Sequence, residues 1–517
     1  MLTDRRPGAR LCVTVGGATM AELRHARDAV VDADLVELRL DATCDPDPAG
    51  ALEGRRHPVI VTCRARWEGG HFAGSEEERQ ALLWRAWELG AEYVDVEHAA
   101  GFAPSLLAQT GGRRVVLSVH DFEGVPHDLP ARVTAMCGAG AEVVKVAVTT
   151  ARLTDALEVF DLGRRLADRN FVAIGMGTAG LATRVLAARV GSSWTYAGSA
   201  WAPGQLTAER LCDEFRFRSL TPDTAVYGVV GRPIAHSVSP AMHNAAFRVE
   251  GLDAVYLPLE AADADDVLAF ADALDLRGAS VTAPFKVDLA ARIPLDDEAR
   301  AVGALNTLVR SGAGWRGTNT DLHGLLAPLR SRLEPARTRA AVLGGGGAAR
   351  AAACALRREG ADVTVHARRR GQADAIAAAL DVRAADWPPI RGSWDLLVNA
   401  TPVGTAPRVD DTPWPDAHFD GRLVYDLVYN PRETRLLREA AAAGLETLGG
   451  LEMLVAQAQR QFLLWTGRLP DGGVMRAAAE RALTRGLVAG ADGVRVRDTV
   501  EADVTVAEAT ESGVRPG

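Results

Sequence analysis

Eight short apolar runs alternate with helix-like stretches in the first part of the chain, and this alternation constrains the fold more than any other feature. Eight strands separated by helices within ~200 residues fit a (β/α)8 barrel. An open, doubly wound sheet has the same alternation and is the alternative. The expected strands are residues 11–15, 35–40, 59–63, 93–97, 115–119, 143–148, 171–176 and 194–197.

The placement of site-forming side chains favours the barrel. In a (β/α)8 barrel the active site is built at the C-terminal ends of several different strands. Here such side chains lie within or just beyond the second, third, fifth, sixth and seventh expected strands. They are Glu37, Arg39, Arg64, His120, Lys145, Met176 and Arg184.

Lys145 is the most informative of these residues. It lies in an apolar strand, and strand alternation directs its side chain inward. A desolvated ammonium releases its proton more readily, and the free amine can attack a carbonyl to form a Schiff base. A solvent-reaching lysine on an edge strand is the alternative, and His120 alone could be a core histidine. Together, the two residues suggest an iminium intermediate with a general acid and base beside it.

Six motifs resemble those of a known family. They are V-E-L-R-L-D (36–41), T-C-R-x-x-x-E-G-G (62–70), S-V-H-D-F (118–122), V-K-V-A (144–147), G-M-G-x-x-G-x-x-x-R (175–184) and A-P-G-Q (202–205). Together they resemble type I 3-dehydroquinate dehydratase over roughly residues 10–215. The resemblance implies that Lys145 forms the Schiff base with the substrate ketone. It also implies that His120 removes the C2 proton and then protonates the leaving hydroxyl, while Glu68 orients His120.

The same resemblance implies a set of substrate contacts and shows one departure. Where many members have serine before A-P-G-Q, this chain has Trp201. A bulky side chain there would reshape the lid of the pocket, so an inactive barrel is an alternative. The implied substrate-binding residues are Glu37, Arg39, Arg64, Met176, Arg184 and Gln205.

A glycine-rich turn organises the second part of the chain. A strand-like run at 341–343 leads into four glycines at 344–347, and a helix-like segment and a second strand-like run follow. In a βαβ unit this order places a phosphate over the glycine turn, at the positive end of the helix. Arg368, Arg369 and Arg370 stand where an NAD enzyme would have an acid. The pattern predicts NADP, although glycines alone are also common in ordinary loops.

Other residues in this part could bind and reduce a carbonyl compound. Ser237 and Ser239 precede a helix start marked by Pro240, where they could cap the helix or bind a carboxylate. Lys286 and Asp321 each follow a strand-like run. A lysine facing a carboxylate can protonate a carbonyl oxygen during hydride transfer. Each residue alone could equally be an ordinary turn residue.

Eight motifs of this part resemble shikimate dehydrogenase over about residues 225–468. They are S-x-S-P-x-x-H-N (237–244), V-T-x-P-x-K (281–286), A-L-N-T-L (304–308), T-N-T-D (318–321), the glycine turn, V-N-A-T-P-V-G (398–404), V-Y-N-P (428–431) and G-G-L-x-M-L-V-x-Q-A (449–458). The resemblance implies that Lys286 and Asp321 form the catalytic pair. The implied shikimate-binding residues are Ser237, Ser239, Thr282, Asn306, Asp321, Tyr429 and Gln457. The implied NADP-binding residues are Gly344, Gly346, Gly347, Ala348, Arg368, Arg369, Asn399 and Thr401.

Two departures from the shikimate dehydrogenase pattern affect selectivity. The usual Asn-Arg-Thr that contacts the 2′-phosphate is here residues 367–369, Ala-Arg-Arg. Ser280 stands where bacterial members often have asparagine. The resemblance therefore leaves the strength of the NADP preference and the choice between shikimate and quinate open.

The length and the motifs together predict the domain organisation. A chain of 517 residues is too long for a single core. We expect an α/β protein in which a (β/α)8 barrel precedes a two-domain dehydrogenase, joined by a short, stiff connector. The expected parts are the barrel at 8–215, a shikimate-binding catalytic domain at 224–335, a Rossmann NADP-binding domain at 336–445, C-terminal helices that return to the catalytic domain at 446–486, and a mobile tail at 487–517.

Composition excludes several classes of function. The net charge of −9 gives no basic footprint for nucleic acid or acidic membranes. The first residues have no apolar core of a signal peptide, and no apolar run is long enough to span a bilayer, so we expect a cytoplasmic protein. Six scattered cysteines without C-x-x-C spacing predict reduced thiols and no metal site.

The two resemblances name consecutive reactions. These are dehydration of 3-dehydroquinate to 3-dehydroshikimate, and NADPH-dependent reduction of that product to shikimate. We therefore expect a bifunctional enzyme of aromatic amino-acid biosynthesis whose partners are these small molecules. A catabolic dehydrogenase that uses NAD and a non-catalytic sensor of the same metabolites are the alternatives. The arginines after the second strand oppose the first, and retention of Lys145, His120, Lys286 and Asp321 opposes the second.

Overall fold

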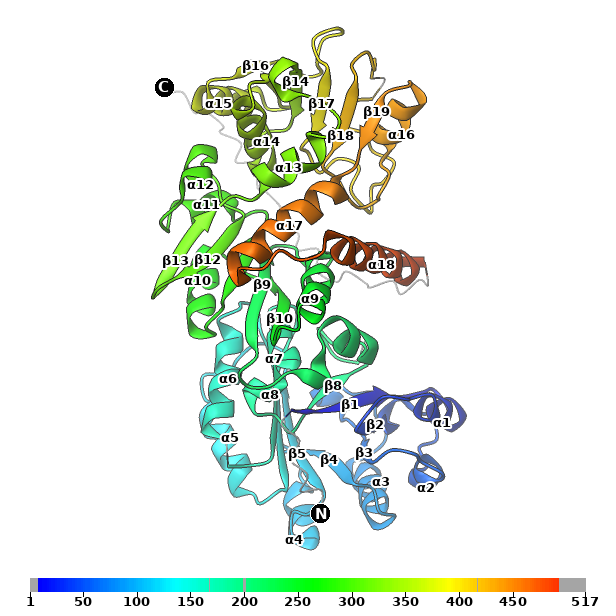
Figure 1. The fold of residues 1–517 in the computed structure, drawn as a ribbon. Helices are drawn as coiled ribbons and strands as arrows, with labels where there is room; N and C mark the ends of the chain where they lie inside the picture. The colour runs from blue at the N-terminus through cyan, green and yellow to red at the C-terminus, as the bar shows by residue number, and fades with distance from the viewer. Residues whose placement is uncertain (1–7, 167, 199–200, 416, 492–517) are drawn as a thin grey trace, which may run out of the picture.

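The computed structural model describes residues 8–166, 168–198, 201–415 and 417–491. It has a barrel at one end and two smaller open sheets beyond it (Figure 1). The chain is therefore an α/β protein with a barrel followed by a two-sheet unit, as the sequence predicts.

Eight parallel strands form the barrel, in the order β7-β6-β5-β4-β3-β2-β1-β8. At the seam between β7 and β8, the Ser193 N–H donates to the carbonyl oxygen of Phe171 over 2.8 Å. The ring is nearly closed, so the barrel prediction is confirmed and the open-sheet alternative is wrong. The strands are β1 Arg10–Val15, β2 Leu35–Arg39, β3 Val59–Thr62, β4 Tyr93–Glu97, β5 Val115–Asp121, β6 Val143–Thr149, β7 Phe171–Met176 and β8 Trp194–Ala197.

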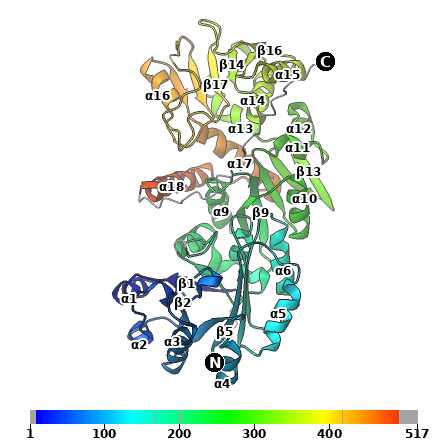
Figure 2. The same cartoon turned by 180° about the vertical axis from the view of Figure 1, so that it is seen from behind.

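Helices cover the outside of the barrel (Figures 1 and 2). Polar residues start several of them: Asp47 caps α2, and Ser75 and Glu78 form a reciprocal capping box on α3. The helices are α1 Met20–Asp28, α2 Pro48–Leu52, α3 Glu76–Glu88, α4 Ala103–Thr110, α5 Leu129–Gly138, α6 Asp155–Arg165, α7 Leu181–Val185 and α8 Ala187–Val190. Short 3₁₀ turns occupy Leu40–Ala42 and Arg66–Glu68.

The second sheet is mixed and has the order β10-β9-β11-β12-β13. Strands β10, β9 and β11 run parallel, whereas β11, β12 and β13 form antiparallel pairs. The strands are β9 Ala225–Gly231, β10 Ala254–Glu260, β11 Gly278–Val281, β12 Thr307–Ser311 and β13 Gly314–Thr318. The helices of this part are α9 Ser239–Val249, α10 Ala264–Ala273, α11 Lys286–Ala290, α12 Asp297–Val302 and α13 Asp321–Leu329.

The third sheet is entirely parallel, with the order β16-β15-β14-β17-β18-β19. Counted along the chain, this is the strand order of a dinucleotide-binding fold, whose ligand lies where the order reverses, between β14 and β17. The Rossmann prediction is therefore confirmed. After the 3₁₀ turn Pro335–Arg337 come β14 Arg339–Leu343, α14 Gly347–Arg358, β15 Asp362–His366, α15 Arg370–Leu380, β16 Arg383–Ala385, β17 Leu396–Asn399, β18 Leu423–Asp426, α16 Arg435–Ala442 and β19 Glu446–Leu448.

Two long helices, α17 Gly450–Thr466 and α18 Gly472–Ala491, lead back from the third sheet to the second. Phe462 of α17 packs against Phe247 of α9, with ring centroids 5.1 Å apart, and α18 also contacts α9. Helix α18 continues beyond the boundary expected at residue 486. The remainder of the expected tail, 492–517, lies outside the described residues.

The connector between the barrel and the second sheet is compact. It contains a π-helix, Arg210–Glu214, and a 3₁₀ turn, Phe217–Ser219. Beside it, Arg189 of α8 donates to the carbonyl oxygens of Pro222, Thr224 and Leu274 over 2.9, 2.8 and 3.1 Å. The barrel and the second sheet are therefore in direct contact.

Within the described ranges, no helix combines the length and apolar composition needed to cross a membrane.

Candidate active sites

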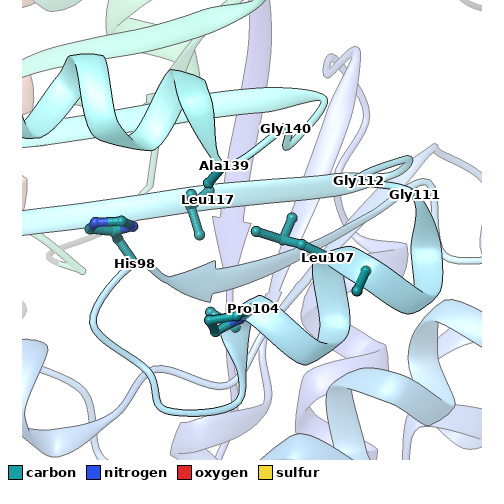
Figure 3. Close-up of a pocket in the computed structure, with 10 residues that line it drawn as sticks. His98, Pro104, Leu107, Gly111, Gly112, Leu117, Ala139 and Gly140 are labelled. Carbon is teal, nitrogen blue, oxygen red and sulfur yellow. The ribbon is translucent and has the colours of Figure 1, made fainter.

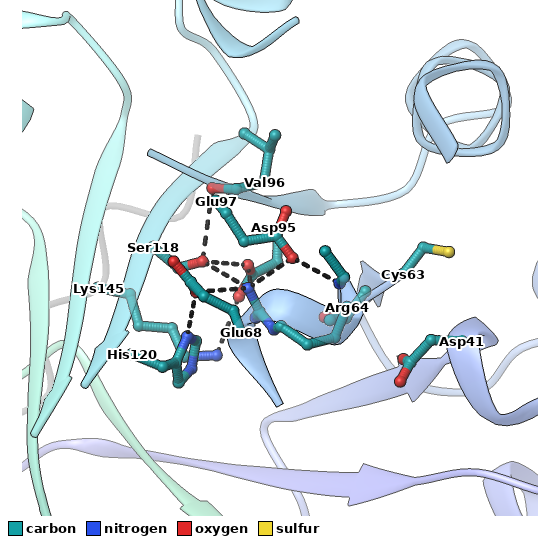
Figure 4. A network of polar contacts seen from close by, with 12 residues as sticks. Asp41, Cys63, Arg64, Glu68, Asp95, Val96, Glu97, Ser118, His120 and Lys145 are labelled. Atoms are coloured by element: carbon teal, nitrogen blue, oxygen red, sulfur yellow. Dashed lines mark hydrogen bonds and ion pairs between the residues drawn. The ribbon is translucent and has the colours of Figure 1, made fainter. Parts of the chain in front are cut away.

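Lys145 lies inside the barrel. Its strand, β6, pairs with β5 on one side and β7 on the other, so the edge-strand alternative is wrong. Its Nζ lies 2.9 Å from Asp95 Oδ2 (Figure 4). It also lies 3.5 Å from Glu37 Oε1. The Tyr196 ring lies beneath it, with Nζ 4.3 Å from the centroid. The amine is therefore buried beside two carboxylates.

Arg64 connects the polar groups of this site (Figure 4). Its Nη2 donates to Asp95 Oδ1 over 2.8 Å, and its Nη1 donates to Glu97 Oε1 and Ser118 Oγ over 3.1 and 2.8 Å. Burial alone would raise the pKa of the Asp95 carboxyl, but the charges of Arg64 and Lys145 overcome this effect and hold the pKa well below its usual range. Asp95 is therefore an anion near neutral pH.

His120 and Glu68 form a pair next to Lys145. His120 Nδ1 lies 2.9 Å from Glu68 Oε2. Burial raises the pKa of Glu68 to about 8, against the opposing charge of Arg64. Burial, and then the charges of Arg64 and Lys145, lower the pKa of His120 well below its ordinary value. The imidazole is therefore neutral, with a carboxyl group in contact that can fix its tautomer.

The lid of the barrel follows β8 and contains Gln205 and Trp201. The Trp201 N–H donates to Gln205 Oε1 over 3.1 Å, and Gln205 Nε2 donates to Thr14 Oγ1 over 3.4 Å. The indole ring stacks on Arg39, whose Cζ lies 5.2 Å from the ring centroid. It also covers Gly16, where a Cβ atom would come within 2.2 Å of a ring carbon. Trp201 therefore forms part of the roof of the site.

Arg184 is a candidate partner for the carboxylate of a substrate. Five arginines of the described chain are buried, and every one except Arg184 forms an ion pair with Asp or Glu. Its Nη2 donates to the Pro203 carbonyl oxygen over 3.1 Å, whereas its Nε has no partner among the described residues. Burial lowers its pKa to about 10. A buried guanidinium without a carboxylate partner favours an anionic ligand.

The other predicted substrate-binding residues surround the same cavity. Glu37 accepts hydrogen bonds from Thr14 and Thr62 over 2.8 and 2.9 Å. Arg39 forms a bidentate pair with Asp41, at 2.8 Å for both bonds. Met176 is buried at the end of β7. Their substrate contacts remain predictions.

The sequence interpretation missed Asp95, Glu97 and Ser118. The two acids alternate on one face of β4, an otherwise apolar strand, and both side chains are almost completely buried. Charged residues spaced two apart in such a strand signal an internal polar network. Only the fold shows that their partner is Arg64.

A second site surrounds Lys286 and Asp321. Lys286 Nζ lies 2.5 Å from Asp321 Oδ2, and Asn306 Nδ2 donates to Asp321 Oδ1 over 2.7 Å. Lys286 opens α11 and Asp321 opens α13, so the carboxylate benefits from the positive end of its helix. The lysine side chain is 19 % exposed and can meet a ligand. The predicted pair and Asn306 are therefore in contact.

The remaining predicted shikimate-binding residues lie on elements around this pair. The residue that caps α9 is Val238, without a side-chain cap bond, and the Ser239 N–H donates to Ser237 Oγ over 3.3 Å. Neither serine is therefore the N-cap residue. Thr282 precedes Lys286 in the same loop, and Phe285 N donates to its carbonyl oxygen over 3.1 Å.

Gln457 lies on α17, and Tyr429 lies just beyond β18 of the third sheet. A Cβ atom on Gly324 of α13 would come within 2.8 Å of Gln457 Cβ, so the helix that begins at Asp321 passes directly beside Gln457. Tyr429 follows β18, and burial raises its pKa. Neither residue has a hydrogen bond to Lys286 or Asp321.

Ser280 belongs to a buried hydrogen-bond chain that the sequence did not reveal. Tyr256 OH donates to Ser280 Oγ over 2.5 Å, and Ser280 Oγ donates to Gln461 Oε1 over 2.7 Å. Gln461 Nε2 donates in turn to Thr307 Oγ1 over 2.9 Å. The chain joins β10, β11 and β12 to α17, so Ser280 helps to hold the helix that carries Gln457.

The glycine turn lies next to Lys286. Gly344 has φ +133°, and a Cβ atom there would come within 2.9 Å of the Ala400 carbonyl oxygen. Helix α14 begins after Gly346 without a side-chain cap, which leaves the N–H groups of Gly347 and Ala348 open to a phosphate. A Cβ atom on Gly347 would lie 3.2 Å from Lys286 Cδ. The turn fits a dinucleotide beside Lys286.

The arginines after β15 differ in their partners. Arg368 and Arg369 are exposed and have no ion pair among the described residues. Arg370 instead pairs with Asp374 and Asp386, over 2.8 and 2.6 Å. The two unpaired guanidinium groups fit the 2′-phosphate of NADP.

Asn399 and Thr401 shape the loop after β17. Asn399 is fully buried, and its Nδ2 donates to Asp426 Oδ1 over 2.8 Å. Its Oδ1 accepts from both the N–H and the hydroxyl of Thr401, over 3.0 and 2.7 Å. Burial raises the pKa of Asp426 to about 6. Through these hydrogen bonds the Asn399 amide fixes the conformation of the loop at the expected cofactor crevice.

A separate pocket of about 440 Å³ opens between α4 and the end of α5 on the outer wall of the barrel (Figure 3). Its lining is apolar side chains and glycine backbone, and His98 is its one titratable side chain. It offers no pair of groups for acid–base chemistry, unlike the two sites above.

Family models match three segments of the chain. These are type I 3-dehydroquinase at residues 11–221, shikimate dehydrogenase substrate binding domain at 229–308, and shikimate 5′-dehydrogenase C-terminal domain at 450–480.

Relatives match both halves. A bifunctional 3-dehydroquinate dehydratase/shikimate dehydrogenase of Arabidopsis thaliana, described as chloroplastic, is 35 % identical over 84 % of this chain and 78 % of its own. The shikimate dehydrogenase (NADP(+)) of Archaeoglobus fulgidus is 42 % identical over 50 % of this chain and 98 % of its own. The solved shikimate 5-dehydrogenase of Thermus thermophilus, in complex with NADP(H) and shikimate, is 38 % identical, covers 50 % of this chain and 99 % of its own, and has a TM-score of 0.47.

Both polar sites thus lie in regions that the family models and relatives match, in the same order along the chain. The chain belongs to the family of bifunctional 3-dehydroquinate dehydratase/shikimate dehydrogenases.

Proposed function

We propose that the barrel dehydrates 3-dehydroquinate and that the second site reduces the product, 3-dehydroshikimate, to shikimate with NADPH. One observation carries this proposal: a single chain of the bifunctional family holds two separate lysine–carboxylate sites, at Lys145 and Lys286. Its substrates are small anionic metabolites, which Arg184 can bind in the barrel.

In the barrel, Lys145 Nζ attacks the substrate ketone, and loss of water gives the iminium. Glu37 lies near enough to take the proton that the amine must release, whereas the charge of Arg64 keeps Asp95 ionised. The neutral imidazole of His120 removes the C2 proton and returns it to the departing hydroxyl, which leaves as water. Hydrolysis of the iminium then releases the product and regenerates Lys145.

In the second site, bound NADPH supplies the hydride. Lys286, held by Asp321, donates a proton to the carbonyl oxygen that becomes a hydroxyl. Asn306 fixes the orientation of the Asp321 carboxylate. Ser237, Ser239, Thr282, Tyr429 and Gln457 are proposed to bind the hydroxyls and carboxylate of the substrate, and the glycine turn and Arg368 and Arg369 to bind the cofactor.

The alternatives are less well supported. In a barrel without activity, the buried charges of Asp95 and Lys145 and the unpaired guanidinium of Arg184 would cost free energy with no ligand to offset the cost. A sensor would not need the Lys286–Asp321 pair next to a glycine turn. We further propose a cytoplasmic location, which the six free cysteines support.

The two activities should separate by mutation. Lys145→Ala removes the nucleophile and should abolish dehydration while reduction of supplied 3-dehydroshikimate continues. Lys286→Ala should do the reverse and lower reduction by about 100-fold or more, since a positioned general acid contributes that much. Loss of NADPH absorbance with 3-dehydroshikimate measures reduction. The ultraviolet absorbance of the conjugated product formed from 3-dehydroquinate, without NADPH, measures dehydration independently of the second site. If either variant loses both activities while still folded, the two-site model is wrong.

The dehydration rate should depend on pH through Glu68. Below about pH 8 the carboxyl of Glu68 holds the shared proton, because its pKa is raised to about 8 and that of His120 is lowered. Above that pH, ionised Glu68 accepts the His120 Nδ1–H and leaves Nε2 able to take the C2 proton. We expect kcat/KM for dehydration, which follows ionisations of the ligand-free enzyme, to rise with pH and level off above about 8. Steady-state rates across this range provide the measurement.

A Glu68→Gln variant supplies the control. Because the amide cannot ionise, the pH-dependent rise should disappear and the plateau should fall by about 10-fold. A variant that keeps the same pH profile would show that Glu68 does not control the rise.

Trp201 and Gly16 should act as a unit. Trp201→Ala removes the stacking on Arg39, and Gly16→Ala displaces the ring, so each should lower kcat/KM for dehydration by about 5-fold. The double variant should have the same kcat/KM as the more strongly affected single variant, because both substitutions disrupt the same contact. Trp201→Phe keeps an aromatic roof and serves as the matched control. Additive losses would contradict a shared contact.

Cofactor preference should depend on the unpaired arginines. Arg368→Gln and Arg369→Gln should each raise KM for NADPH, by roughly 10- to 100-fold where a charge-assisted bond to phosphate is lost, and leave KM for NADH nearly unchanged. Arg370→Gln is the matched control, because its guanidinium is already paired with Asp374 and Asp386. An equal effect of all three substitutions would mean that only overall charge matters.

A further inference from the structure

The loop that follows the Schiff-base strand is held by the other half of the protein. Residues 150–154 join β6, which carries Lys145, to α6, and they lie at the catalytic end of the barrel. Helix α10 of the second sheet begins beside this loop. Its first turn contains Asp266, whose side chain is 1 % exposed.

Asp266 accepts three hydrogen bonds from the loop. Its Oδ2 accepts from the Leu153 N–H over 3.0 Å, and its Oδ1 accepts from the Thr154 N–H and hydroxyl over 2.9 and 2.8 Å. The same carboxylate accepts from the Ala262 N–H over 3.0 Å, which anchors it at the start of α10. One buried anion therefore joins the two halves of the chain.

The remaining N–H groups of the loop are held within the barrel. Asp155 Oδ2 accepts from Ala151 and Arg152 over 2.8 and 3.0 Å. Arg152 also pairs with Asp263 across the boundary over 2.9 Å. Of the four N–H groups of residues 151–154, two thus donate to a barrel residue and two donate to Asp266 of the second half.

The loop is connected to the substrate-binding side of the barrel. The Thr150 N–H and hydroxyl donate to the Met176 carbonyl oxygen over 3.0 and 2.8 Å. Gly177 N donates to the Pro203 carbonyl oxygen in the lid over 3.2 Å, and Arg184 Nη2 donates to the same oxygen over 3.1 Å. Helix α7, which carries Arg184, contacts β10 directly. A displaced loop would therefore shift Met176, the lid and Arg184.

We propose that Asp266, although it lies in the dehydrogenase half, is a positioning residue for the dehydration site in the barrel. It fixes the β6–α6 loop and, through Thr150 and Met176, the groups that hold the substrate over Lys145. The inference rests on the proposed function of the barrel. Because reaction rates fall steeply with small displacements of positioned groups, loss of this carboxylate lowers dehydration and leaves reduction intact.

The first test uses the full-length chain with Asp266→Ala. We expect kcat/KM for dehydration to fall by about 10-fold, with most of the loss in KM for 3-dehydroquinate, and reduction of 3-dehydroshikimate to stay unchanged. Asp265→Ala is the matched control, since its side chain lies in the same helical turn but is 76 % exposed, and its one ion pair within the described ranges is with Arg292. It should leave both rates unchanged.

Two variants of Thr154, on the barrel side of the contact, test the inference even if Asp266→Ala fails to fold. Thr154→Val removes the hydroxyl that donates to Asp266, whereas Thr154→Ser retains it. We expect Thr154→Val to raise KM for 3-dehydroquinate by about 5-fold and Thr154→Ser to restore the native value. The double variant Asp266→Ala with Thr154→Val should show less than the product of the two losses, because both changes break the same contact.

Two results would overturn the inference. One is unchanged dehydration in both Asp266→Ala and Thr154→Val. The other is a parallel loss of both activities in step with a lower melting temperature, which would mean that the contact only stabilises the fold. Trapping of the Lys145 adduct by borohydride in the native chain separates this inference from the proposed function: without an adduct the function proposal fails, and with one, the behaviour of the variants decides the role of Asp266.

Discussion

The pairing of buried charges is the constraint on which the barrel depends. Lys145 and Arg64 lie in its interior with Glu37, Asp95 and Glu97, and an isolated ion there would lose far more in hydration than it gains. Arg64 resolves this problem because one guanidinium contacts both acids of β4. The same arrangement prepares the chemistry, since it keeps Asp95 ionised beside the amine. Stability and reactivity therefore rest on the same contacts.

The second site uses the ends of helices instead of a closed interior. Lys286 and Asp321 each open a helix, and the glycine turn that begins α14 lies against the lysine side chain. The positive end of α13 adds to the charge of Lys286 in stabilising the Asp321 carboxylate. This site can therefore stay more open than the barrel, which suits a reaction whose cofactor must enter and leave. The hydrogen-bond chain through Ser280 and Gln461 supplies rigidity from behind.

Local patterns in the sequence predicted the barrel strands and the Rossmann fold, because strand alternation and glycine turns are local properties. The residues of the proposed chemistry were predicted from motifs, and the fold brings several of them into contact. Partner choice is not local. The roles of Asp95 as partner of Lys145, and of Arg370 as an ion-paired rather than ligand-binding arginine, depend on residues that the fold brings together. The unpaired state of Arg184 could not be predicted either, since it is defined by the carboxylates that are missing around it.

Because Asp266 bonds to the β6–α6 loop, a residue late in the sequence affects the geometry of the barrel that precedes it. Asp266 comes after the whole barrel in the sequence, yet the loop behind Lys145 takes two of its backbone restraints from it. During synthesis the barrel strands can pair before α10 exists, because all eight precede it. The loop nevertheless acquires its final geometry only when the second sheet has docked. By contrast, the Lys286–Asp321 pair is built from α11 and α13, which both follow the barrel in the sequence. The proposed dehydration site therefore takes restraints from the second half of the chain, whereas the Lys286–Asp321 pair is formed within that half.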